Sequence, residues 1–186
     1  MYHMITRRQV LAAVGVSSTL AGCPAVFRGE HVVTLSDETT IEIPASPEDV
    51  PVSNGDRSLP SDIGENIHTE VTLGDRVTGD SPHDVRILNP LGVPEIYVGI
   101  VDLAADSVVY DERHPIPEDK KLQITLLEHS DYLVAVSVPE IERQHTVRVP
   151  CDYFDCNDST TYIGIDEDGQ ISSSIFREAV ACPSPC

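Results

Sequence analysis

The sequence predicts an all-β protein whose body is an antiparallel β-sandwich, and three observations support this fold class. Apolar residues alternate with polar ones at a period of two, turn-forming residues separate these runs about every eight to twelve positions, and helical periodicity is almost absent. The chain has 186 residues, which is enough for one medium domain. We therefore expect a single β-sandwich domain over residues 31–186.

The first two expected strands form a hairpin. His31–Leu35 and Thr39–Ile43 are rich in β-branched residues, and Ser-Asp-Glu separates them. Residues 44–64 follow with four prolines, the turn pair Asn54-Gly55 and many acidic side chains. This composition predicts a surface loop inserted before the next strand.

The main sheets are expected within residues 67–149. The run 95–103 is apolar on both faces, which is typical of a central strand. The other runs alternate between apolar and polar residues, and one of them ends at Asn89-Pro90. The strands predicted in this region are 67–73, 84–88, 95–103, 107–110, 122–126, 132–138 and 145–149.

Residues 151–186 are expected to form a Cys-bearing hairpin. The strands 160–166 and 170–173 flank Glu167-Asp168-Gly169, and an Asp-Gly pair tolerates the positive φ angles of a tight turn. Ser174–Ala181 is the only segment whose sequence is compatible with a helix, of one or two turns. We expect the aromatic pair Tyr153-Phe154 to cover one edge of the core.

The order of features over residues 84–173 resembles the immunoglobulin-like sandwiches. A strand closes at Asn89, a two-faced strand follows, and Ser130-Asp131-Tyr132 opens a late apolar strand. The resemblance implies a tyrosine corner, in which the Tyr132 hydroxyl binds a backbone group upstream.

Residues 1–22 have the anatomy of an export signal, with a basic start, a short apolar stretch and small residues at the end. The pair Arg7-Arg8, flanked by Thr6 and by Gln-Val-Leu, resembles the twin-arginine export motif. Leu-Ala-Gly-Cys23 resembles a lipobox, in which Cys23 is acylated and becomes the first mature residue. Residues 23–30 would then be a short tether, and the lipid would hold the protein on the outer side of the cell membrane.

The charge balance restricts the partners. The 31 acidic and 12 basic residues give a net charge of -19, which disfavours binding to nucleic acid. Concentrated salt would screen the repulsion between these acids. Together with the export motifs, this composition resembles the small twin-arginine-exported lipoproteins of haloarchaea, and that resemblance implies no activity.

Four cysteines follow Cys23, and an even number in an oxidising exterior predicts two disulfides with three connectivities. We favour bridges that join the pair Cys151 and Cys156 to the pair Cys182 and Cys186. The alternative is a four-thiolate zinc site, but the spacings C-x4-C and C-x3-C differ from the common C-x2-C pattern.

Other candidate ligand sites are weaker. The loop 152–158 carries three aspartates and Asn157, so calcium is a candidate ligand, although its spacing is not that of an EF-hand. His68 and His83 stand beside acids and suit a divalent cation, but we favour solvated histidines on strand faces. A blue-copper centre is disfavoured because no histidine follows Cys151 and both methionines precede residue 23.

Asn157-Asp158-Ser159 matches the N-glycosylation acceptor pattern, which requires surface exposure in an exported protein. No hydrolase, metalloprotease or nucleotide-binding motif is present, so we expect no catalysis and no cofactor beyond the lipid. The sequence predicts a cell-surface structural or protein-interaction module with an unidentified surface protein as its partner. The alternative is a lipoprotein accessory to transport that binds a small ligand or a metal.

Overall fold

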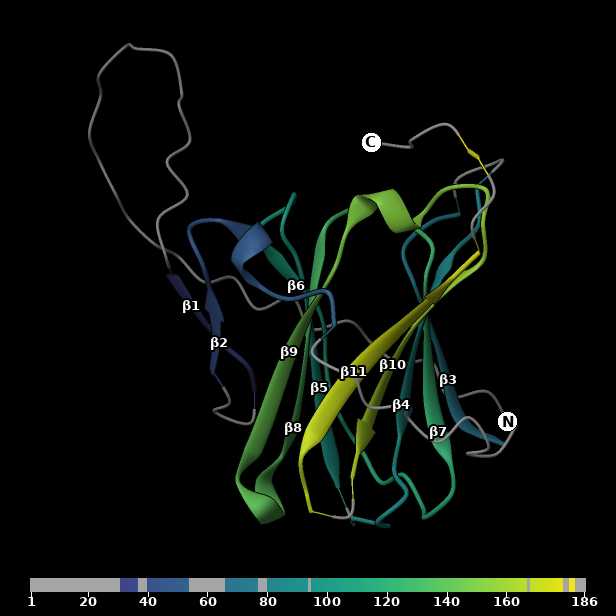
Figure 1. Cartoon of the computed structure of the whole chain (residues 1–186). Helices are drawn as coiled ribbons and strands as arrows, with labels where there is room; N and C mark the ends of the chain where they lie inside the picture. Colours follow the sequence, from purple (N-terminus) through teal and green to yellow (C-terminus); the bar gives the residue numbers. More distant parts are fainter. Residues whose placement is uncertain are drawn as a thin grey trace, which may run out of the picture.

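The computed structural model describes residues 31–36, 40–53, 66–76, 80–93, 95–166, 168–178 and 181–182 (Figure 1). This part of the chain is all-β, as predicted, with three short 3-10 turns. No helix within these ranges has the length and apolarity needed to cross a membrane. The strands are β1 (His31–Thr34), β2 (Thr40–Ile43), β3 (Ile67–Leu73), β4 (His83–Leu88), β5 (Ile96–Asp102), β6 (Ser107–His114), β7 (Lys121–Leu126), β8 (Tyr132–Val138), β9 (Arg143–Val149), β10 (Ser159–Ile165) and β11 (Ile171–Arg177).

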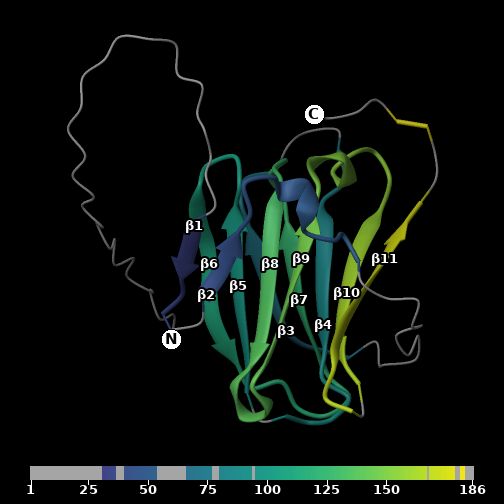
Figure 2. The same ribbon diagram turned by 60° about the vertical axis from the view of Figure 1, so that its left-hand side comes forward.

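Two sheets form the body of the molecule. One has five strands in the order β11-β10-β4-β7-β3, and the other has four in the order β6-β5-β8-β9. The two sheets lie face to face in Figures 1 and 2. The main core fills the space between them with side chains from both sheets, among them Val85, Ile124, Val98 and Val134. The predicted sandwich arrangement therefore follows from alternation that turns one face of each strand inward.

A third layer covers the outer face of the four-stranded sheet. The hairpin β1-β2 lies against this sheet in Figure 2. Leu35 and Ile41 pack with Tyr97 and Leu133 in a second, smaller core. Strands β5 and β8 are buried along their whole length because they have packed neighbours on both faces. This layer explains why the sequence of β5 is apolar on both faces.

The close approach of this layer depends on Gly99 in β5. A Cβ atom at position 99 would lie 2.3 Å from Leu35 Cδ1, far inside van der Waals contact. Glycine therefore lets the hairpin settle onto the sheet.

The prediction of purely antiparallel sheets is wrong for the five-stranded sheet. β4 pairs parallel with β10, and β3 pairs parallel with β7, whereas the four-stranded sheet is antiparallel throughout. Alternation determines which face a strand presents, but it does not determine the direction of its neighbours. Both parallel pairs join strands that are distant in sequence, so no hairpin turn signals them.

The candidate helical segment 174–181 is a strand as far as Arg177. β11 continues to Arg177, and its pairing with β10 runs from Ser159 opposite Arg177 to Ile165 opposite Ile171. β10 therefore satisfies the backbone of this segment across the ladder. β6 likewise extends to His114, four residues beyond the predicted end.

Local turn predictions are confirmed. Gly169 has φ +72° in the turn between β10 and β11, and the Asp166 carboxylate accepts hydrogen bonds from the backbone of Asp168 and Gln170. The Tyr132 hydroxyl donates to the Glu128 carbonyl at 3.0 Å, which is the expected tyrosine corner.

The first part of the predicted insert at 44–64 packs on the body. A 3-10 turn covers Pro47–Asp49, and the Pro51 carbonyl accepts a hydrogen bond from the Arg148 backbone at 3.0 Å. Residues 54–64 lie outside the described residues.

Candidate functional site: the Cys loop

Residues 151–158 connect β9 to β10, and we call them the Cys loop. A 3-10 turn at Cys151–Tyr153 opens the loop, and the Asp155 carbonyl accepts a hydrogen bond from the Ser81 backbone at 2.8 Å. Phe154 is fully buried at the end of the sandwich. The centroid of its ring lies 5.9, 5.7 and 5.9 Å from the ring centroids of His83, His129 and Tyr132. The predicted aromatic lid over the core edge is therefore confirmed.

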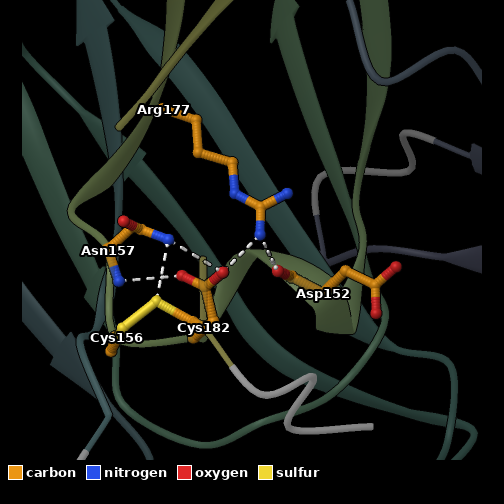
Figure 3. The surroundings of a disulfide bond; sticks show 6 residues. Asp152, Cys156, Asn157, Arg177 and Cys182 are labelled. Carbon is orange, nitrogen blue, oxygen red and sulfur yellow. Dashed lines mark hydrogen bonds and ion pairs between the residues drawn. A yellow bond between two sulfur atoms is a disulfide. The ribbon is translucent and has the colours of Figure 1, made fainter. Parts of the chain in front are cut away.

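A disulfide between Cys156 and Cys182 joins the Cys loop to the segment after β11 (Figure 3). It links the two cysteine pairs in the manner that the sequence favoured. These two sulfurs are oxidised and offer no thiolates, so the four-thiolate zinc alternative is wrong. Cys151 is disulfide-bonded as well. Cys186 lies outside the described residues, so its place in a second bridge stays a prediction.

Asp155 lies at the centre of the Cys loop, and the whole residue is only 4% exposed. Its Oδ1 accepts from the Asn157 backbone N–H at 2.8 Å, and its Oδ2 accepts from Asn157 Nδ2 at 3.1 Å. Arg177, the last residue of β11, forms an ion pair with the same carboxylate and donates to the Asp152 carbonyl at 2.9 Å (Figure 3). One arginine thus fastens the end of β11 to the Cys loop.

This environment shifts the pKa of Asp155 downward. Burial by itself raises the pKa, but the hydrogen bonds from the Asn157 backbone, Arg177 and the Asn157 amide outweigh burial, with help from the Arg177 charge. Asp155 is therefore held in its charged form.

In the loop that was the candidate calcium site, the guanidinium of Arg177 binds the buried carboxylate. The Asp155 carboxylate, which would have been a ligand, is occupied by Arg177 and Asn157. Within the described ranges, no three His, Cys, Asp or Glu side chains are grouped so as to hold a metal ion.

Asn157, the candidate glycosylation site, is not exposed at the surface. Asn157 is 2% exposed. Its Nδ2 donates to Asp155 and also to the Cys182 sulfur at 3.0 Å. A glycan on Nδ2 would have to replace one of these N–H bonds and bring the buried amide into solvent. The expected surface exposure of Asn157 is therefore wrong for the folded body, and glycosylation itself stays a prediction.

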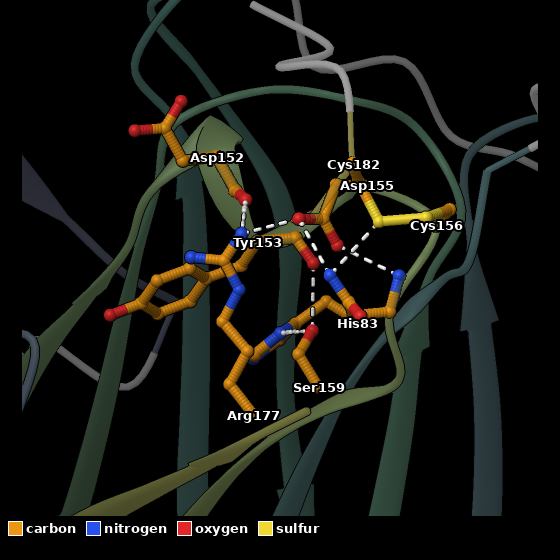
Figure 4. Close-up of polar contacts among 9 residues, drawn as sticks. His83, Asp152, Tyr153, Asp155, Cys156, Ser159, Arg177 and Cys182 are labelled. Carbon is orange, nitrogen blue, oxygen red and sulfur yellow. Dashed lines mark hydrogen bonds and ion pairs between the residues drawn. A yellow bond between two sulfur atoms is a disulfide. The ribbon is translucent and has the colours of Figure 1, made fainter. Parts of the chain in front are cut away.

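His83 is fully buried, which corrects the expectation of a solvated histidine on a strand face. Sheet register places Ser159 of β10 beside His83 of β4 on one side and Arg177 of β11 on the other. His83 Nδ1 lies 2.8 Å from Ser159 Oγ (Figure 4). His83 Nε2 lies 2.9 Å from Thr161 Oγ1. His68, by contrast, is exposed on β3.

The hydrogen bonds identify the tautomer of His83. Ser159 Oγ donates its one proton to the Tyr153 carbonyl at 2.7 Å, so it must accept from His83 Nδ1–H. Nε2 is then the acceptor for the Thr161 hydroxyl. Burial lowers the pKa of His83 from 6.5 to about 3, so the ring is neutral near pH 7.

The pair formed by Ser159 and His83 has the separation of a nucleophile and its base but not their chemistry. His83 presents an N–H, not a lone pair, to the serine, and Ser159 is only 3% exposed. A general base must accept the proton of the nucleophile. This pair therefore ties β4, β10 and the Cys loop together.

The sequence did not predict two side-chain contacts, one at the Cys loop and one on β6. The Arg177 guanidinium lies 5.3 Å from the centroid of the Tyr153 ring, but Arg177 fell within the candidate helical segment. On β6, outside the Cys loop, the Tyr110 hydroxyl lies 2.6 Å from His114 Nε2, whereas the predicted strand ends at Tyr110. The spacing Tyr-x-Glu-x-His over 110–114 was an available signal, because alternation places all three side chains on one face.

The predicted export and lipidation residues, Arg7, Arg8 and Cys23, lie outside the described residues. No protein-family model and no curated protein matches the sequence.

Proposed function

We propose that this chain is the precursor of a lipid-anchored protein of the cell exterior. In this proposal, an immunoglobulin-like β-sandwich acts as a structural or protein-interaction module in concentrated salt and catalyses no reaction. The Arg7-Arg8 motif directs export, and Cys23 carries the lipid.

The observation that carries the proposal is the disulfide between Cys156 and Cys182. Structural disulfides persist in oxidising compartments and are rare in a reducing cytosol. The disulfide lies in the folded body, far along the chain from the signal. It therefore supports export independently of the N-terminal motifs.

The charge pattern supports a saline setting. Four described arginines pair with acids, as Arg86 with Asp84, Arg113 with Glu95, Arg148 with Asp131 and Arg177 with Asp155. The sequence has many more acids than bases, so repulsion among the remaining acids is large in dilute buffer and is screened at high ionic strength.

The interior supports a structural role. Among the described residues, every buried side-chain polar atom has a hydrogen-bond partner. The network around His83 and Asp155 consists of such satisfied contacts, and a satisfied polar network holds a core in one arrangement.

One exposed face supports association with other proteins. Phe176 of β11 is 58% exposed on the outer face of the five-stranded sheet. Tyr162 is on the same face of β10, since register places Thr160 opposite Phe176. The Arg86 guanidinium lies 5.7 Å from the Tyr162 ring centroid. Aromatic residues and arginine are enriched where proteins bind one another.

Localisation of tagged variants in a halophilic host tests the proposal. We expect the wild-type protein on the outer face of the cell membrane, where a membrane-impermeant label can react with it. Arg7→Lys with Arg8→Lys should accumulate as an unlabelled precursor, and Cys23→Ser should leave the membrane fraction. Arg143→Lys, a change within the body, is the matched control and should behave as the wild type. Surface labelling of the double lysine variant at the wild-type level would contradict the proposal.

A further inference from the structure

The two cysteines of the Cys156–Cys182 disulfide differ in exposure and in hydrogen bonding. We propose that the bond between Cys156 and Cys182 is a thiol–disulfide exchange site, at which an incoming thiolate attacks the Cys156 sulfur and Cys182 is the leaving thiol. This inference goes beyond the proposed function, because it assigns a reaction with external thiols to the C-terminal staple.

Exposure of the two cysteines favours attack at Cys156. Cys156 is exposed, whereas Cys182 is only partly exposed. The disulfide lies at the end of the sandwich, where the Cys loop meets the segment after β11 (Figures 3 and 4). Exchange requires an approach along the axis of the S–S bond to the attacked sulfur. The more open residue is therefore the expected target.

Hydrogen bonding distinguishes the leaving group. Asn157 Nδ2 donates to the Cys182 sulfur at 3.0 Å. Within the described part of the chain, the Cys156 sulfur accepts no hydrogen bond. A donor stabilises negative charge on the sulfur that it contacts, and a stabilised thiolate leaves faster. The amide thus favours cleavage in which the electron pair of the S–S bond moves to Cys182.

The exchange balances with a dithiol as the reductant. One thiolate of the dithiol forms a bond to the Cys156 sulfur, the bond between Cys156 and Cys182 breaks, and Cys182 departs as a thiolate that takes a proton from water. The second thiol of the dithiol loses its proton to water and attacks the mixed disulfide, which releases Cys156 as a thiolate. Two electrons pass from the dithiol, which becomes a disulfide, to the protein.

The surrounding contacts make the reaction reversible. Arg177 lies five positions before Cys182, and it binds Asp155, next to Cys156, through contacts that do not involve the S–S bond. This ion pair limits the separation of the two thiols after reduction. Closure of the disulfide is then an intramolecular step at high effective concentration.

Adduct mapping on the mature full-length protein in high salt tests the proposal. The protein is treated briefly with glutathione, free thiols are alkylated, and peptides are analysed by mass spectrometry. Because a hydrogen bond to a charged group is involved, we expect at least about a tenfold excess of glutathione on Cys156, with alkylation on Cys182. Equal adducts, an excess on Cys182, or no exchange at this bond would overturn the proposal.

Variants isolate the part played by the amide. Asn157→Ala should reduce the preference for Cys156 by about tenfold, and Asp158→Ala, a change at an exposed neighbour, should retain it. An unchanged preference in a folded Asn157→Ala protein would overturn the role of Asn157. If that variant does not fold, the adduct ratio of the wild type still decides the direction of attack.

Discussion

The guanidinium of Arg177 and the buried carboxylate of Asp155 form an ion pair that joins the last residue of β11 to the Cys loop. The Asp155 side chain is 5% exposed and the Arg177 side chain 36% exposed. Arg177→Met should therefore leave a charged, poorly hydrated carboxylate. We expect a loss of about 2 to 3 kcal/mol in the free energy of unfolding, measured by chemical denaturation in high salt.

The double-variant cycle with Asp155→Asn provides the control. The loss should be smaller when both charges are removed, because no charge is then left buried without its partner. Arg113→Met is the matched control, since its pair with Glu95 is exposed and should contribute less than about 1 kcal/mol. Equal effects of Arg177→Met and Arg113→Met would contradict the proposed importance of the buried pair.

His83 makes stability depend on pH. Its pKa is lowered from 6.5 to about 3 in the folded protein, so between these values the unfolded chain binds a proton that the folded protein does not. The contribution of neutral His83 to the free energy of unfolding is complete above pH 6.5. It decreases by about 1.4 kcal/mol for each pH unit as the pH falls toward 3. Urea unfolding at pH 7.5, 6 and 5 measures this slope.

Variants separate His83 from the other titrating groups. Burial also lowers the pKa values of His114 and His145, and these residues act in the same direction. His83→Gln should reduce the slope by the His83 share, because the glutamine side chain binds no proton in this pH range. An identical slope in the His83 variant and the wild type would mean that this ring is not buried and neutral.

The disulfide between Cys156 and Cys182 should stabilise the folded β-sandwich. The bridge spans 26 residues, so loop-closure entropy predicts that Cys156→Ser with Cys182→Ser costs about 3 to 4 kcal/mol. Hydrogen exchange should show faster opening at the Arg177 end of β11 than at the Ile171 end. Unchanged thermal unfolding of the double serine variant would contradict this prediction.

Gly99→Ala tests the third layer. The added methyl would overlap Leu35 and should destabilise the fold by about 1 to 3 kcal/mol. Leu35→Ala makes room, so the double variant should be more stable than the sum of the single effects predicts. Strict additivity would mean that the hairpin does not press on β5 at this point.

Local alternation predicts much of the strand content. The bounds of β3 and β8 agree with the sequence analysis because their patterns and flanking turns are clear. His83 could have been placed correctly as well, since it alternates in register with the inward residues Val85 and Ile87. The neighbouring Asp84 suggested that His83 is exposed to solvent, but Asp84 lies on the opposite face of β4.

Contacts between distant segments could not be predicted in the same way. The ion pair of Arg177 with Asp155 depends on the full length of β11, and the parallel pairing of β4 with β10 depends on the path of the chain between them. The burial of Asn157 also has a tertiary origin, because its side-chain amide donates to Asp155 in the Cys loop and to Cys182 after β11. Sequence patterns report local geometry, while these features arise only in the folded body.

Mass spectrometry of the intact protein and its fragments, after extraction from host membranes, tests the central claim most directly. We predict a chain that begins at an acylated Cys23 and retains the disulfide between Cys156 and Cys182. A full-length precursor with Met1 intact and all five thiols free, recovered from the cytosol, would contradict export, lipidation and the oxidised staple together.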